Sequence, residues 1–235
     1  MLSRLKRDLT MAEAARTATG ARVDLVVVAG MVEHGAKVLD VGCGDGELLH
    51  LGLSASFVLA GGGDLRYRAR PESILAPFFV DTDEIDGNSA FVGLEVAWRR
   101  GPFSMQGEML RSFIYGDEDG SLTFHGLYAQ ASWTVTGESR PYDAAQALFG
   151  RLEPAAPFAP RRDRWGALEL TARTSWLDLD DGPVRGGRLW TLDVGPAWTW
   201  NRWVRVLGGY VFARSTGRED AGHAHILQLR LEVQL

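Results

Sequence analysis

The residues from Ser121 to Asp143 carry the clearest pattern of apolar and polar side chains in the chain. One side of the pattern is apolar and the other is polar: Leu127, Ala129, Ala131, Trp133 and Val135 alternate with Tyr128, Gln130, Ser132, Thr134 and Thr136. A period of two predicts a β-strand with one apolar face. Its length of about ten residues exceeds the ~5–6 residues of ordinary strands. It matches the ~9–11 residues that a tilted strand needs to cross a bilayer.

The same alternation recurs along the chain from about residue 55 onward. The further predicted strands are Asp64–Ala69, Phe91–Arg99, Phe103–Phe113, Trp165–Leu179, Arg188–Trp200, Trp203–Ala213 and Leu227–Leu235. With the strand after Ser121 they make about eight. The fold class expected is therefore mainly β, an antiparallel transmembrane β-barrel, with a small α/β fragment at the N-terminus.

The connections between these strands differ in length. Gly101-Pro102 and Asn201-Arg202 are short, whereas 137–164, 180–187 and 216–222 are long and polar. Transmembrane barrels have short turns at one end and longer loops at the other. The sequence thus predicts that the short and long connections lie at opposite ends of the sheet.

The nature of the two faces suggests which solvent each one meets. The polar positions hold Gln, Thr, Ser, Glu, Arg and Asp but almost no Lys, unlike the solvent face of a soluble barrel. Aromatic residues gather towards strand ends, as in the girdles of a membrane barrel: Trp98, Phe103, Trp133, Trp165, Trp176, Trp190, Trp198, Trp200 and Trp203. We expect the apolar face to contact lipid. A soluble antiparallel β domain is the other reading of the same pattern.

Composition narrows the choice of function. The 235 residues carry a net charge of −5, which does not indicate nucleic-acid binding. A single cysteine, Cys43, excludes an internal disulfide framework. No apolar run reaches the ~18 residues of a transmembrane helix. We recognise no secretory signal near the N-terminus, which leaves a cytoplasmic location open.

The N-terminal part has a different character. Residues 21–34 predict a helix, Val38–Val41 a short strand, and Glu47-Leu48-Leu49 the start of another helix. Between them stands a D-x-G-x-G-x-G turn whose glycines permit close approach of a ligand. Over about residues 20–50 this segment resembles motif I of S-adenosylmethionine-dependent methyltransferases of the MetW type. That resemblance implies cofactor contacts at Asp40, Gly42, Gly44 and Gly46. The alternating helices and strands that complete such a domain do not follow.

The β region resembles the C-terminal half of phosphate-selective porins of the O and P type, over about residues 62–235. Ordered segments carry the resemblance: RPESILAPFFVDT, GPFSMQGEMLRS, YAQASWTVTGESRPYD, FGR, WGALELTARTSWLDLDD, GGRLWTLDVGPAWTWN and ILQLRLEVQL. The resemblance implies a homotrimeric, sixteen-stranded outer-membrane channel for phosphate or polyphosphate. It places the inward-folded constriction loop in the half of the family's chain that is missing here. We divide the chain into a truncated methyltransferase-like segment, 1–54, and a porin-like domain, 55–235.

Alternation and the resemblance together single out arginines for the lumen. They are Arg66, Arg68, Arg99, Arg173, Arg205 and Arg230. Guanidinium groups bind phosphate through charge-assisted, often bidentate hydrogen bonds. The alternative is that each arginine pairs structurally with an acid of the same face, namely Glu95, Glu108, Glu169, Asp193 or Glu232. Both readings stay open.

The chemistry expected of the chain is transport rather than catalysis. We assign no catalytic residue and no metal site, because the pair His223 and His225 lies near a loop and is more typical of solvated histidines. The partners expected are phosphate or other anions and outer-membrane lipid. An S-adenosylmethionine-dependent methyltransferase is the alternative function.

Overall fold

The computed structural model describes residues 48–58, 64–116, 120–144, 146–218 and 221–234. The chain divides into two compact units, Met1–Val41 and Gly42–Leu235, and all described residues belong to the second. The predicted N-terminal helix and the glycine turn at 40–46 lie outside the described residues. The boundary that we placed after residue 54 therefore stays a prediction.

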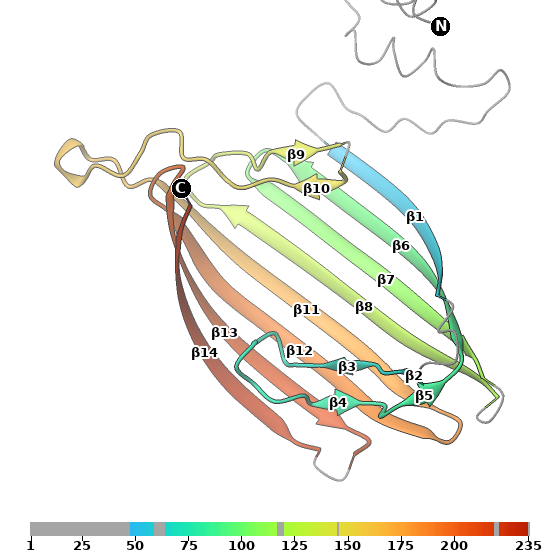
Figure 1. Ribbon diagram of the computed structural model, residues 1–235. Helices are drawn as coiled ribbons and strands as arrows, with labels where there is room; N and C mark the ends of the chain where they lie inside the picture. The colour runs from blue at the N-terminus through green and yellow to red at the C-terminus, as the bar shows by residue number, and fades with distance from the viewer. Residues whose placement is uncertain (1–47, 59–63, 117–119, 145, 219–220, 235) are drawn as a thin grey trace, which may run out of the picture. The chain divides into compact units, whose positions relative to one another are not determined.

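The second unit is built around one antiparallel sheet of eight strands in the order β1-β6-β7-β8-β11-β12-β13-β14 (Figure 1). The strands are β1 Leu48–Val58, β6 Asn88–Arg100, β7 Phe103–Tyr115, β8 Ser121–Thr134, β11 Ala167–Asp181, β12 Val184–Thr199, β13 Val204–Thr216 and β14 His223–Val233. Each is at least 11 residues long, which confirms the prediction of a mainly antiparallel β chain with about eight strands of membrane-crossing length.

One member of the predicted set is wrong. Asp64–Ala69 does not join the sheet, and its place is taken by β1, where a helix was predicted to begin at Glu47. Leu49, Leu51 and Leu53 share a face of β1, opposite Trp98, Val96 and Leu94 of β6. Pairing along the whole length of β6 thus overrides the local helical preference of Leu48-Leu49.

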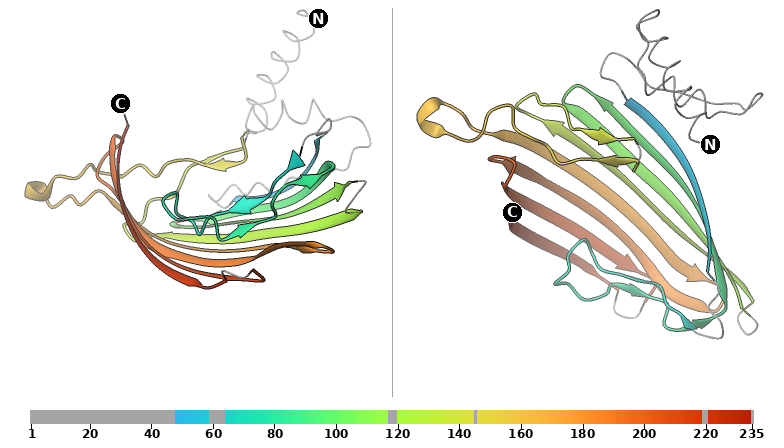
Figure 2. Two further views of the ribbon diagram at one scale, coloured as in Figure 1. Left: turned by 60° about the horizontal axis from the view of Figure 1, so that its bottom comes forward. Right: turned by 45° about the horizontal axis from the view of Figure 1, so that its top comes forward.

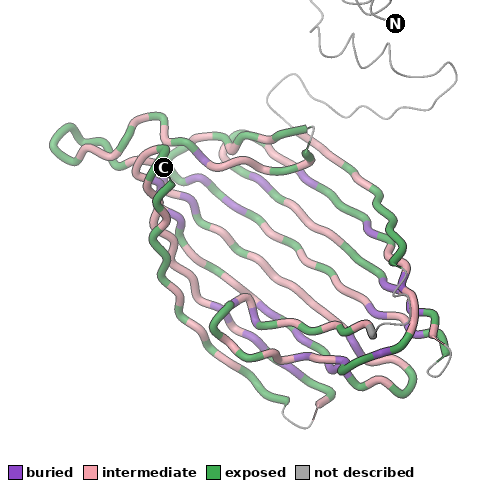
Figure 3. Tube along the Cα trace, viewed as in Figure 1, coloured by how far each residue is buried: buried purple, intermediate pink, exposed green. Residues whose placement is uncertain are grey.

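The register of the sheet separates two faces, because directly paired residues point to the same side. The convex face is apolar and open: Leu53 is 75% exposed, Leu229 83% and, mid-sheet, Leu170 44%. Along much of the strands, exposed residues alternate with buried or intermediate ones (Figure 3). Figure 2 shows that the sheet curves, with residues 64–86 on its concave side.

Phe158 and Trp165 contact Trp198 at one end of the convex face. The described part of the chain leaves most of that face open. Its helical content is one 3-10 turn, η1 Pro160–Arg162. No helix among the described residues is long and apolar enough to span a membrane. The expectation that this apolar face contacts lipid stays a prediction.

The predicted segregation of short and long connections is wrong. In an up-and-down sheet, alternate connections lie at the same end, so 135–166 shares an end with 101–102 and 200–203. We call this the hairpin end, because 135–166 carries a small hairpin, β9 Tyr142–Asp143 and β10 Leu148–Phe149. The predicted loop 180–187 is also wrong, because β11 and β12 extend through most of it.

Residues 64–86 form a strap that crosses the concave face at the other end, the strap end (Figures 1 and 2). It holds four two-residue strands, β2 Asp64–Leu65, β3 Arg68–Ala69, β4 Val80–Asp81 and β5 Ile85–Asp86, with β2 paired to β5 and β3 to β4. Val80 and Ile85 of the strap pack in one buried cluster with residues of the eight-stranded sheet, which we call the wall. The wall residues in this cluster are Ile114, Leu122, Phe124, Leu179, Leu189 and Ala213. An inward-folded segment is thus present in this chain, where the resemblance had placed such a segment in the missing half.

Glu72 fixes the middle of the strap to the wall. Its Oε1 accepts hydrogen bonds from Ser175 Oγ at 3.0 Å and Thr191 Oγ1 at 3.3 Å, and lies 3.5 Å from Arg173 Nε. Its carbonyl oxygen accepts a bond from Gln228 Nε2 at 3.2 Å. Glu72 also has a φ of 52°, a left-handed conformation that only surrounding contacts sustain in a non-glycine residue.

A charge placed on the convex face tests which solvent that face meets. Val194→Arg on this face should lower the free energy of unfolding in lipid vesicles by about 2–4 kcal/mol, the cost of a cation near the bilayer midplane. Gln106→Arg, which faces the concave side, is the matched control and should cost less than about 1 kcal/mol. Urea unfolding followed by tryptophan fluorescence measures both. Equal stability of the two variants would contradict a lipid-facing convex surface.

Removing the carboxylate of Glu72 tests how the strap is held. Glu72→Ala should lower the opening free energy of the strap by about 1–3 kcal/mol, because it leaves Ser175, Thr191 and Arg173 without their shared acceptor. Hydrogen exchange at the amides of Phe79 and Thr82, which donate to Ala69 O and Tyr67 O, reports the opening. Glu84→Ala, an exposed strap acid, should leave exchange unchanged. Identical exchange in both variants would show that Glu72 does not secure the strap.

Candidate functional site: the polar concave face

The concave face gathers polar side chains from successive strands. The register aligns Gln106, Gln130, Arg173 and Asp193 in one row across β7, β8, β11 and β12. Arg173 lies near the middle of this row, with its guanidinium 3.8 Å from the ring centroid of Tyr128 and 3.5 Å from Gln130 Oε1. The row places one half-buried cation, Arg173, beside two amide side chains and one carboxyl group.

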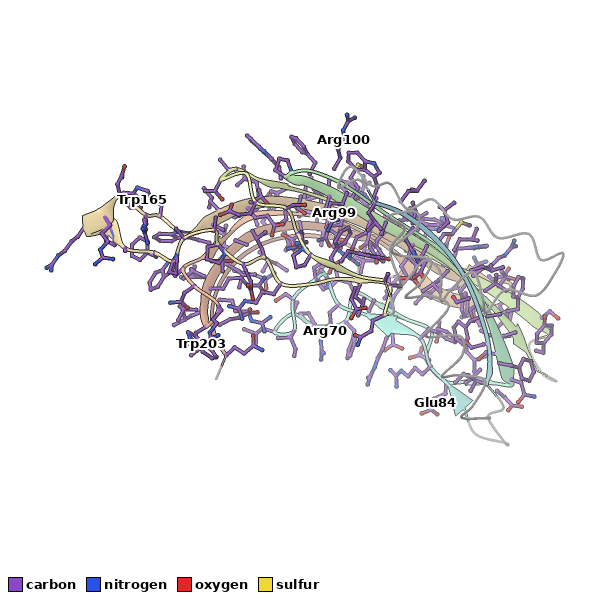
Figure 4. All side chains as sticks on the ribbon, turned by 90° about the horizontal axis from the view of Figure 1, so that it is seen from above. Arg70, Glu84, Arg99, Arg100, Trp165 and Trp203 are labelled. Carbon is purple, nitrogen blue, oxygen red and sulfur yellow. The ribbon has the colours of Figure 1, made fainter. Side chains whose placement is uncertain are left out.

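The strap adds a second line of arginines. In the sequence LRYRAR, Leu65, Tyr67 and Ala69 pack against the apolar cluster, so the alternate residues Arg66, Arg68 and Arg70 are directed away from it and are exposed. Figure 4 places Arg70 on the concave side of the sheet, whereas Arg100 points away from the convex side. The spacing of two residues is thus what turns all three guanidinium groups the same way.

The three strap arginines differ in their partners. Arg66 Nε and Nη2 donate to the two oxygens of Asp81 at 2.8 and 2.7 Å, and this hydrogen bonding holds the pKa of Asp81 below its usual range. Arg68 and Arg70 instead stack on the ring of Phe78, at 4.2 and 4.1 Å from its centroid. Within the described part of the chain, neither of them forms an ion pair.

Further arginines reach the concave face near the hairpin end. Arg205 Nε and Nη2 both donate to Glu232 Oε2, at 3.0 and 2.7 Å, and Arg230 Nη2 lies 3.2 Å from Glu232 Oε1. Arg140, from the segment 135–166, donates to Glu169 Oε2 at 2.6 Å, and Arg99 Nη1 donates to the carbonyl oxygen of Arg140 at 2.7 Å.

A hollow of about 310 Å³ opens on this face. Cations and acids both line it; the charged members are Glu72, Arg140, Glu169, Asp193, Arg205 and Arg230. Glu169 is only 2% exposed, and its second oxygen, Oε1, has no hydrogen-bond partner among the described residues. Such a surface offers guanidinium groups to an anion, but the nearby carboxylates compete for the same groups.

The predicted arginines therefore separate into two groups. Arg99, Arg173, Arg205 and Arg230 lie on the concave face of the sheet. The placement of Arg66 and Arg68 on a wall strand is wrong, because they belong to the strap.

The predicted acids meet different partners. Glu169 and Glu232 pair with arginines, whereas Glu95 contacts His50 Nε2 at 3.1 Å. Two of the acids that hold arginines, Glu72 and Asp81, come from the strap and were not predicted.

Sequence reasoning missed Arg70 and Arg140. Arg70 continues the alternation of Arg66 and Arg68 by one step, so the signal was present in the sequence but the predicted strand stopped at Ala69. Arg140 lies in a loop, where alternation says nothing about direction. His223 and His225 lie on the convex face, and His225 Nδ1 is 2.7 Å from Tyr210 Oη. Asp40, Gly42, Gly44 and Gly46 lie outside the described residues.

Comparison with known proteins gives this geometry a family. The sequence profile of the family "Phosphate-selective porin O and P" matches residues 12–235. Porin O of Pseudomonas aeruginosa is 31% identical over 155 residues, which are 59% of this chain and 34% of that protein. An uncharacterized protein of Caulobacter vibrioides is 30% identical over 149 residues, 60% of this chain and 29% of that protein. The chain spans about a third of the length of these curated relatives.

The comparisons also bear on the alternative reading of the N-terminal part. The matched range includes residues 40–46, and neither relative is named as a methyltransferase, so the methyltransferase reading gains no support. The resemblance over 62–235 is confirmed, and the match begins earlier, at residue 12. The chain belongs to the family of phosphate-selective porins O and P.

Proposed function

We propose that this sheet is part of the wall of an outer-membrane channel that passes phosphate or polyphosphate anions. Family membership, the name of the relative Porin O and the two-faced sheet support the proposal. The channel acts without catalysis. Outer-membrane lipid meets the convex face, and the anions pass along the concave face.

The single observation that carries the anion path is the line of Arg66, Arg68 and Arg70 on the strap. The side chains of Arg68 and Arg70 are exposed on the concave side, and neither is neutralised by a described carboxylate. Stacking on Phe78 fixes their guanidinium planes and leaves the N–H groups at their edges for a ligand. A phosphate oxygen accepts such N–H groups through charge-assisted hydrogen bonds.

The paired arginines fit a path through which anions move rather than stay. Arg173, Arg205 and Arg230 each have an acid within 3.5 Å, so an anion competes with a carboxylate for the guanidinium group. Conduction requires several sites, each of which binds an anion weakly enough to release it. Arg68 and Arg70 of the strap are the stronger attractors, and the paired arginines of the wall are the weaker sites beside them.

Closure of the wall follows from the physics of lipid. Among the described residues, β1 and β14 each have a partner on one side only. Unpaired strand edges in hydrocarbon cost several kcal/mol per polar group. We therefore propose that further strands close the ring in the membrane, and that the closed barrels assemble as a homotrimer, as the family resemblance implies.

Planar-bilayer recording tests the channel. The full chain should give discrete channel events, and phosphate should block its chloride current by competing for the arginines. The double variant Arg68→Ala/Arg70→Ala should raise the half-blocking concentration of phosphate about tenfold, the loss expected for one or two charge-assisted hydrogen bonds.

Arg111→Ala is the matched control for that experiment. Arg111 lies on the convex face of β7, over the ring of Phe113, and its loss should leave the phosphate block unchanged. Absence of channel events would remove the transport function. Events with equal block in both variants would remove the strap arginines from the anion path.

A further inference from the structure

We propose that a groove on the convex face at the strap end binds the phosphorylated headgroup of an anionic membrane lipid. This inference rests on the proposed membrane location of the sheet. The groove has a volume of about 260 Å³ and is lined by Trp176, Arg188, Trp190, Arg214 and Thr216. It is separate from the concave face, on which the anion path lies.

The register explains why these side chains meet. Trp176, Trp190 and Arg214 are cross-strand neighbours on β11, β12 and β13. Arg188 and Thr216 form the adjacent pair on the same face, one step nearer the strap end. Two indoles and two guanidinium groups are thereby placed side by side where the strands leave the apolar band. Aromatic residues mark that interface in membrane barrels.

The groove is held in shape before any ligand arrives. Trp190 Nε1 donates to Thr174 Oγ1 at 3.0 Å, and its ring meets Phe212 edge-on at 5.7 Å. Arg188 Nε donates to Asp178 Oδ2 at 2.9 Å and lies 3.8 Å from Asp180 Oδ2. These contacts fix one indole and one guanidinium group, and so reduce the ordering that binding would require.

Arg214 supplies the positive charge that attracts the phosphate of the headgroup. Its side chain is exposed, and among the described residues it forms no ion pair. Its cross-strand neighbour on β14 is His223, so no acid faces it from that side. A guanidinium group at the boundary of an apolar surface is suited to a phosphate, which accepts two parallel N–H bonds in the fork geometry.

The surface next to the groove selects a lipid over a free anion. Phe212 is two residues from Arg214 on the same face, and Val194, Leu227 and Leu229 continue that face across β12 and β14. Leu227 and Leu229 are 84% and 83% exposed. A free phosphate leaves this area unused, whereas a lipid places its phosphate at Arg214 and its acyl chain along the apolar side chains.

Native mass spectrometry of the detergent-folded full chain tests the site. The chain should retain phosphatidylglycerol in preference to phosphatidylcholine with the same acyl chains. Arg214→Gln should weaken the retention of phosphatidylglycerol about fivefold, the contribution of one arginine near an anionic surface. Arg214→Lys keeps the charge and should recover part of the affinity.

Arg111→Gln is the matched control, because Arg111 lies on the same convex face and in the same row as Arg188 but outside the groove. It should retain the lipid as the unchanged chain does. The heat-modifiable gel shift of a folded membrane barrel shows whether the Arg214→Gln variant has folded. If the folded variant retains phosphatidylglycerol as well as the unchanged chain does, the lipid site alone is overturned. A chain that fails to fold in detergent would overturn the membrane location and the lipid site together. Displacement of the lipid by millimolar inorganic phosphate would show a free-anion site instead.

Discussion

In the channel that we propose, burial of the convex face by hydrocarbon is the interaction on which the rest of the structure depends. Side chains such as Leu53 and Leu229 are mostly exposed, and no described element covers them. Removing their apolar surface from water lowers the free energy by about 25 cal/mol per Å². In a membrane the same surface would meet hydrocarbon, and the backbone polar groups inside the sheet are already paired by the ladders that run from β1 to β14, apart from the outer edges of these two strands. The curved sheet then leaves its polar face for the interior.

The strap adds a second polar surface on the concave side of the sheet. Its apolar side packs on the wall through the cluster around Val80 and Ile85, and Glu72 binds three wall side chains at once. The opposite side then carries Arg66, Arg68 and Arg70. The same two-residue period that divides each strand of the sheet into an apolar convex face and a polar concave face therefore divides the strap into an apolar side that packs on the sheet and a basic side that is exposed.

The sequence predicted the wall well because period-two alternation reports directly on which face each residue occupies. The facing of Arg173, Arg205 and Arg230 follows from it without any knowledge of neighbours. The sequence-based prediction was wrong for β1, because Leu48-Leu49 also suits a helix. Only the pairing with β6 determines that this segment is a strand. The prediction that the long segment 135–166 lies at the opposite end from the short turns was also wrong, because loop length does not determine the end of the sheet at which a loop lies. The partners Glu72 and Asp81 depend on how the strap folds back, which no local pattern encodes.

Cysteine labelling along β14 in lipid vesicles tests the central claim most directly. In a Cys43→Ser background, single cysteines at Leu227, Leu229 and Leu231 face the convex side, and cysteines at Gln228 and Arg230 face the concave side. A water-soluble maleimide should label positions 228 and 230 and leave 227, 229 and 231 unreacted. Uniform labelling, or labelling of the leucine positions alone, would show that water and not hydrocarbon meets the apolar face.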